Sequence, residues 1–144
     1  MSSVPTDRVV NETTLRVRYA ETDAMGIVYH TNYLIWFEVG RGELSRQMGV
    51  DYRTWEEMGL YLPVVEASCR YLAPARYGDL VIISTWVEEA RSRTVIFAYE
   101  ARLQETGQVL AMGRTVHVCV NRAGQTTQIP PAWREIMSGK TGEK

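Results

Sequence analysis

The pattern of hydrophobic and polar residues begins with a strand and a long helix. From Thr13 to Tyr19 apolar residues alternate with arginines, which is typical of a half-buried strand. Apolar side chains then recur at helical spacing from about Asn32 to Met48, and Gly49 is well placed to end a helix there. The sequence therefore predicts a strand, a junction and a helix, in that order.

Two glycines lie inside the predicted long helix. Gly40 and Gly42 each weaken a helix by up to ~1 kcal/mol relative to alanine. A glycine in mid-helix often marks the close approach of another backbone, so we expect a sheet to wrap around this helix. Simple tolerance of the two glycines is the alternative.

The rest of the chain predicts short helices and four more strands. Asp51 can cap a helix over Tyr52–Met58, which Gly59 ends. The other expected elements are strands at about 62–72, 79–90, 94–104 and 108–121, tight turns at 91–93 and 105–107, and a helical tail at 133–137.

This order of elements indicates an α+β fold, with one antiparallel sheet packed on a central helix. We expect a single domain over 1–144, with loose tails at 1–12 and 138–144. The helix is apolar along one side only, so an edge or face of the sheet remains for a homo-oligomer to cover.

Composition narrows the classes of function. The net charge of -1 shows no basic excess, which argues against a general nucleic-acid binder. No apolar run approaches the ~18–20 residues that span a bilayer, and the first residues do not resemble a signal peptide, so a cytoplasmic location is expected. We expect Cys69 and Cys119 to be buried reduced thiols, and with two histidines in the chain we expect no metal site.

The candidate chemistry lies in the junction over 19–33, where the strand gives way to the helix. A lone carboxylate, Asp23, precedes Gly26 at the point where backbone amides and the positive end of the helix dipole can stabilise an anion or polarise a carbonyl. A plain Asx-turn or a helix cap is the structural alternative for Asp23.

The residues of this junction resemble those of a known family. The matching residues are Arg18-Tyr19, Thr22-Asp23, Gly26-Ile27-Val28-Tyr29-His30, Asn32-Tyr33 and Phe37-Glu38, with a weaker second match over 71–79. In these the chain resembles the hotdog-fold thioesterases, specifically the 4-hydroxybenzoyl-CoA thioesterase-like family of small bacterial acyl-CoA hydrolases. The resemblance implies a hotdog fold, in which a five-stranded antiparallel sheet wraps a long helix, and dimers that join their sheets edge to edge and often pair into homotetramers.

The resemblance also implies roles for the junction residues. The family carries its catalytic carboxylate at the position of Asp23, which can attack the acyl carbon or deprotonate a water. Amides around His30 and Thr31 would face the thioester oxygen, and Gly26 would let the substrate approach the backbone. His30 can act through its ring or only through its amide. Tyr29 and Tyr33 are candidates to line the acyl site, although packing is an alternative for Tyr33.

The sequence also suggests roles for other polar residues. Glu21 is expected to be solvated or paired with Arg18 rather than catalytic, Glu38 is not expected to be catalytic, and His117 is expected to be structural. A local basic group is expected for the phosphates of coenzyme A, and the turn of Arg91, Ser92 and Arg93 is the best candidate, with Arg70 and Arg76 behind it. An ordinary solvated turn is the alternative, and the chain has no glycine-rich nucleotide loop.

The expected function is therefore hydrolysis of an acyl-CoA thioester, with an aromatic or a short-to-medium acyl group, to a carboxylate and free coenzyme A. No cofactor is expected, because coenzyme A is part of the substrate. Two rivals keep the fold: a thioesterase for acyl-carrier-protein thioesters, and a module that binds acyl-CoA without turnover.

Overall fold

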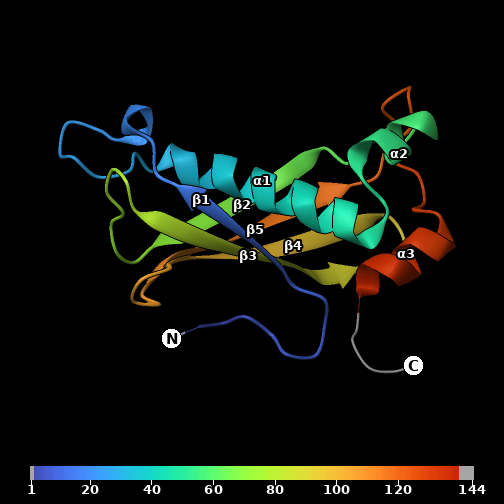
Figure 1. Ribbon diagram of the computed structural model, residues 1–144. Coiled ribbons are helices and arrows are strands. Elements are labelled where there is room, and N and C mark those ends of the chain that lie inside the picture. Colours follow the sequence, from blue (N-terminus) through green and yellow to red (C-terminus); the bar gives the residue numbers. More distant parts are fainter. Residues whose placement is uncertain (1, 140–144) are drawn as a thin grey trace.

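The computed structural model describes residues 2–139, which form a curved sheet with one long helix lying across it (Figure 1). The sheet has five antiparallel strands, which confirms the predicted α+β architecture. The elements are β1 (Asn11–Arg16), α1 (Thr31–Met48), α2 (Tyr52–Glu57), β2 (Val64–Tyr71), β3 (Leu80–Ala90), β4 (Thr94–Leu103), β5 (Val109–Val118) and α3 (Pro131–Ser138). Among the described helices, none has both the length and the apolar character needed to cross a bilayer.

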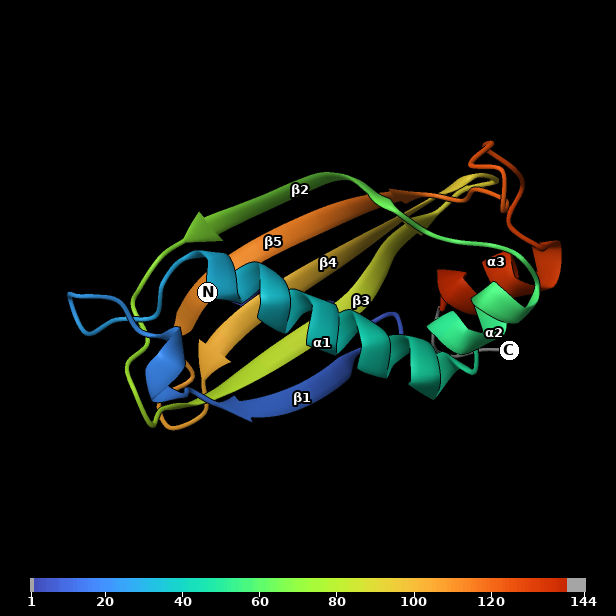
Figure 2. The same cartoon turned by 90° about the horizontal axis from the view of Figure 1, so that it is seen from above.

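Helix α1 crosses the concave face of the sheet (Figure 2). Its apolar side is buried because Trp36, Phe37 and Leu44 lie against the strands. Phe37 stacks on Tyr99 of β4 with ring centroids 4.5 Å apart. The helix ends at Gly49, which takes the left-handed conformation at φ 82° as predicted.

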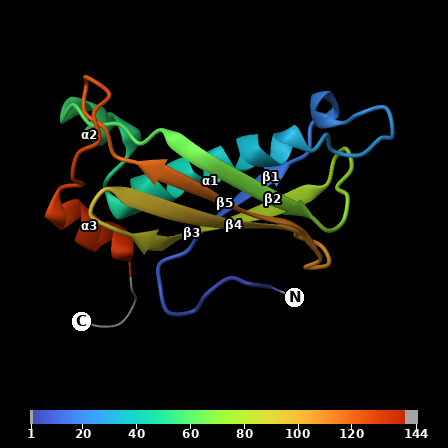
Figure 3. The same cartoon turned by 180° about the vertical axis from the view of Figure 1, so that it is seen from behind.

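The strand order is β1-β3-β4-β5-β2, so β2 forms one edge of the sheet and lies nearest the viewer in Figure 3. The side chains of β2 are almost all exposed. At its middle, Cys69 pairs with Gly113 of β5, whose missing side chain leaves room for the ring of Phe37.

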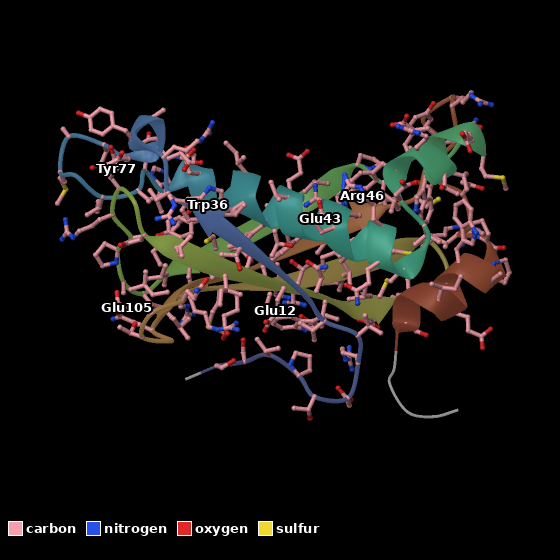
Figure 4. The ribbon with its side chains drawn as sticks, viewed as in Figure 1. Glu12, Trp36, Glu43, Arg46, Tyr77 and Glu105 are labelled. Carbon is pink, nitrogen blue, oxygen red and sulfur yellow. The ribbon has the colours of Figure 1, made fainter. Side chains whose placement is uncertain are left out.

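The two ends of the sheet carry different loops. At one end lie the junction over 22–30, the β2–β3 connection with Tyr77 and the β4–β5 hairpin with Glu105 (Figure 4). At the other end lie α2, α3 and the β3–β4 turn over 91–93. The predicted turns are confirmed, since the Arg91 amide donates to the Thr94 carbonyl and the Gly107 amide to the Leu103 carbonyl.

The first strand is shorter than predicted. It ends at Arg16, and Tyr19 begins a short 3-10 turn in which its side chain is 77% exposed rather than sharing a buried strand face. The turn forms because the Glu21 side chain accepts a hydrogen bond from the Arg18 amide, 2.8 Å away. This contact ends the strand pattern earlier than alternation alone suggests.

The lead-in before β1 is held on the sheet rather than loose. It runs over the face turned away from α1 (Figure 1). The Ser2 hydroxyl and the Ser3 amide both donate to the buried carboxylate of Glu100, at 2.9 Å each. The Arg8 guanidinium donates to the Val87 carbonyl at 2.9 Å. Of the tail expected over 138–144, residues 140–144 lie outside the described part of the chain.

The two helix glycines lie in different surroundings. A Cβ at position 40 would overlap Thr85 Oγ1 and come within 3.0 Å of Ile83 Cγ2, whereas a Cβ at position 42 would meet only Arg46, at 3.7 Å. The sheet therefore approaches the helix closely at Gly40, as expected, and Gly42 is merely tolerated.

This difference predicts opposite effects of alanine at the two positions. Gly40→Ala is expected to destabilise the protein by about 1–3 kcal/mol through overpacking. Gly42→Ala is expected to stabilise it by up to ~1 kcal/mol, because the helix gains a better helix former without a clash. Urea unfolding of the two variants beside the wild type measures both changes, and equal effects of the two would contradict this packing.

Candidate active site

The junction loop is closed by its own backbone and by Asp23. A bridge joins Thr22 to Val28, and Gly26 turns the chain at φ 81°. The Asp23 amide donates to the Ile27 carbonyl at 2.8 Å. The left-handed conformation at Gly26 suits a residue without a side chain, which is why the loop can reverse there.

Asp23 uses one carboxylate oxygen to hold this loop. Its Oδ1 accepts from the Met25 amide at 2.8 Å and, more weakly, from the Ile27 amide at 3.4 Å. Within residues 2–139 no group is bonded to Oδ2, and the side chain is partly exposed. The Asx-turn alternative is thus present, and it leaves one oriented carboxylate oxygen for chemistry.

The start of α1 supplies backbone donors beside this loop. His30 is the N-cap residue and makes no side-chain cap bond. No acceptor among the described residues is bonded to the amides of His30 and Thr31. Unpaired amides at a helix start, reinforced by the helix dipole, favour a negative oxygen.

Aromatic side chains surround His30. Its exposed ring packs 4.6 Å from that of Tyr29 and 5.9 Å from that of Tyr71, measured between centroids. The Tyr71 hydroxyl donates to the His30 carbonyl at 3.0 Å. Tyr33 is buried against Tyr71 and Trp36, and this burial raises the pKa of Tyr33 to about 12. Tyr33 is therefore buried as a packing residue, which was the alternative to lining the acyl site. Tyr29 and His30 remain accessible.

Sequence reasoning missed the importance of Glu21. Its side chain is only 6% exposed and accepts from the Trp36 indole at 3.0 Å as well as from Arg18. The Glu21 carbonyl accepts from the Tyr29 amide at 2.8 Å and from the Asn32 side chain at 2.9 Å. Glu21 thus joins the loop to the first turns of α1.

The charge of Glu21 is stabilised where it is buried. Burial alone would raise the pKa of this carboxyl, but hydrogen bonds from the Arg18 amide, the Trp36 indole and the Arg18 guanidinium lower it. The pairing with Arg18, at 3.3 Å, was predicted; the solvated alternative is wrong. No local pattern links Glu21 to Trp36, 15 residues away, so the sequence carried no signal for this contact.

The basic turn lies at the far end of the sheet from Asp23 in the same chain (Figure 1). Arg91 is paired with Glu89 at 2.7 Å, whereas Arg93 is exposed and has no side-chain partner within residues 2–139. Ser92 is exposed, and its carbonyl accepts from the Ile129 amide. One chain therefore does not bring Arg91, Ser92 and Arg93 together with the loop.

The remaining candidates lie away from the loop or form no cluster. His117 is buried in β5, as a structural residue would be, and Glu38 is exposed on α1. Cys69 and Cys119 are both free thiols, with Cys119 buried and Cys69 half-buried. Across residues 2–139, no three His, Cys, Asp or Glu side chains gather as metal ligands would.

Comparison with known proteins identifies the family. Residues 17–137 match the model of the thioesterase-like superfamily. The chain belongs to this family. The matched residues include the junction loop, α1 and all strands except β1, so the resemblance inferred from the junction is confirmed.

Several known proteins are similar to this chain over most of its length. YneP of Bacillus subtilis is 37% identical over 78% of this chain and 81% of its own. The acyl-CoA thioesterase YbgC of Haemophilus influenzae is 34% identical over 74% and 78% of the two chains. The crystal structure of a DHNA-CoA thioesterase from Staphylococcus aureus, 31% identical, covers 90% of this chain and 89% of its own with a TM-score of 0.83.

Proposed function

We propose that this protein hydrolyses acyl-CoA thioesters, with Asp23 as its catalytic carboxylate. The observation that carries the proposal is that one oriented Asp23 oxygen and the amides of His30 and Thr31, which flank the same loop, have no hydrogen-bond partner within residues 2–139. Family membership and the similarity to acyl-CoA thioesterases support the reaction class.

The geometry suggests a separate role in hydrolysis for the backbone amides, for Asp23 and for the exposed aromatic rings. The thioester oxygen would accept from the amides of His30 and Thr31, which stabilise the charge that develops on it. Asp23 Oδ2 would attack the acyl carbon and expel coenzyme A, forming a mixed anhydride that a water then hydrolyses, or it would take a proton from a water that attacks the acyl carbon directly. In both routes coenzyme A leaves as the thiol and the acyl group as the carboxylate. The exposed rings of Tyr29 and His30 would contact the acyl group or the pantetheine arm.

A panel of thioesters tests the reaction class. Thiol release should be fast with some aromatic or short-to-medium acyl-CoAs and slower with the same acyl groups on acyl carrier protein. The reverse preference would favour the carrier-protein rival, and binding of acyl-CoA without thiol release would identify a non-catalytic module.

We further propose that two chains pair through β2. This edge exposes apolar side chains, with Val65 59% and Val64 46% exposed. An unpaired, apolar sheet edge is a template for a second copy. Antiparallel pairing of two β2 strands would also bring the β3–β4 turn of one copy to the end of the sheet where the other has Asp23.

A charge on the β2 edge is expected to separate the two copies. Val65→Lys should shift the protein to a smaller particle in analytical ultracentrifugation, because an unpaired lysine buried between two β2 strands is costly. Hydrolysis should also fall, because the separated copies no longer bring the β3–β4 turn of one chain to the Asp23 end of the other. Met58→Lys is a matched control, since Met58 is also 59% exposed but lies after α2. An unchanged particle mass in Val65→Lys would contradict pairing through β2.

The same pairing gives the basic turn a role in holding the phosphates of coenzyme A. We expect Arg93→Ala to raise KM for acyl-CoA by roughly tenfold with kcat unchanged, because one charge-assisted contact is lost. The KM for the matching acyl-pantetheine, which lacks the nucleotide phosphates, should not change. Arg53→Ala, on α2, is the control. Equal effects of Arg93→Ala on KM for both substrates would show that the turn does not bind the phosphates of coenzyme A.

A further inference from the structure

A cavity of about 760 Å³ lies under the N-terminal run, and no residue of the junction loop lines it. Trp86, Ala98 and Arg114 form its floor in register across β3, β4 and β5. They alternate along these strands with Thr85 and Tyr99, which face α1. The cavity therefore opens on the opposite face of the sheet from α1.

The charged residues that line this cavity are mainly arginines. Three of its lining residues are Arg8, Arg70 and Arg114, and its one lining acid is Glu88. Glu88 bonds a single nitrogen of Arg114, at 2.8 Å. No carboxylate pairs with Arg70 among the residues that the structure describes. Guanidinium donors thus remain available to an anion at this rim.

The interior of the cavity is apolar and of a suitable size for a small molecule. Trp86 and Met112 line it, and the small side chain of Ala98 leaves the hollow between them. Its volume lies within the ~300–1,000 Å³ of ordinary ligand pockets. Ser3 and Pro5 of the N-terminal run line the remaining side, and Glu100 holds this run in place by accepting from Ser3.

We propose that this cavity binds a planar organic carboxylate. The carboxylate would lie on the guanidiniums of Arg70 and Arg114, which bind such groups in a bidentate manner. Its ring would lie against the indole of Trp86. A second copy of the chain fits this face less well, because the centre of a protein interface is depleted of charged residues.

Benzoate is a direct probe of this site and requires no turnover, so its result is independent of the proposed function. Calorimetry should show one saturable benzoate site per chain, and benzamide, which lacks the charge, should not bind. Arg70→Gln should weaken benzoate binding by at least tenfold, whereas Arg53→Gln on α2 should not change it. Benzoate should also change the fluorescence of the wild type but not that of Trp86→Phe.

Four results would overturn the proposal. Unchanged affinity in Arg70→Gln, or a fluorescence change that persists in Trp86→Phe, would place benzoate elsewhere. Competitive inhibition of hydrolysis that survives Arg70→Gln would place it at the thioester site. No benzoate binding together with a smaller particle for Arg70→Gln in ultracentrifugation would assign this face to a second copy of the chain.

Discussion

Asp23→Asn is expected to lower acyl-CoA hydrolysis by roughly 10³-fold or more, because the amide can neither attack the acyl carbon nor accept a proton from water. The fold should survive, since the asparagine oxygen still accepts from the Met25 and Ile27 amides that close the loop. Thiol release under saturating substrate, with wild type and variant side by side, measures the loss as a change in kcat.

Asp51→Asn provides a matched control for this prediction. Asp51 also accepts a backbone hydrogen bond, from the Thr54 amide at 3.1 Å, but it caps α2 at the other end of the molecule. Its variant should retain wild-type hydrolysis. Full hydrolysis by a folded Asp23→Asn protein would show that the chemistry assigned to Asp23 is wrong.

Lowering the pH from 6.5 to 4 is expected to reduce the free energy of unfolding by about 3 kcal/mol through His117. Burial, with a smaller contribution from the Arg41 charge, lowers the pKa of His117 from 6.5 to about 4. Between these values the unfolded chain binds the proton and the folded chain does not, so stability falls as the pH falls. Urea unfolding at several pH values measures this slope.

The hydrogen bonds of His117 explain why it stays neutral. Nδ1 lies 2.9 Å from the Leu62 carbonyl and Nε2 lies 2.8 Å from the Thr115 hydroxyl. We assign the proton to Nδ1, because a carbonyl can only accept. Thr115 then donates to Nε2 and accepts from the Tyr99 hydroxyl, which accepts in turn from Arg41. A second proton on His117 would break this chain of bonds.

Two variants separate His117 from other titrating groups. His117→Gln should flatten the slope between pH 6.5 and 4.5, whatever its effect on stability at pH 7, whereas His30→Gln on the exposed ring should retain it. Glu21 contributes chiefly at the acid end of this range, because its lowered pKa means that stability falls once the pH is low enough to protonate it. An unaltered slope in His117→Gln would contradict this assignment.

Much of the local structure could be predicted because its causes are local. Helix α1 was expected over about 32–48 and lies at 31–48. The expectation was accurate because the apolar spacing and the helix end at Gly49 both depend on residues that are close together in the sequence. The same holds for the cap at Asp51 and for the turn at Gly107. The choice of Asp23 also came from a local motif at a strand-to-helix junction.

Contacts between distant segments could not be predicted, because periodicity shows which face of an element is buried but not what it meets. Glu21 accepts a hydrogen bond from Trp36, and Glu100 accepts one from the N-terminal run. The partners are so far apart in the sequence that no local pattern predicts either contact. His117 was expected to be structural, but its neutral state depends on Thr115, Tyr99 and Arg41 meeting in the fold.

By itself, the sequence determined the elements, the α+β class and the loop that carries Asp23, since each depends on short-range spacing and capping. Only the tertiary structure decided the strand order β1-β3-β4-β5-β2, the exposed β2 edge and the cavity beneath the N-terminal run. It also put the turn of Arg91 and Arg93 at the far end of the sheet from Asp23. These features depend on which surfaces bury one another, and that is a property of the whole chain.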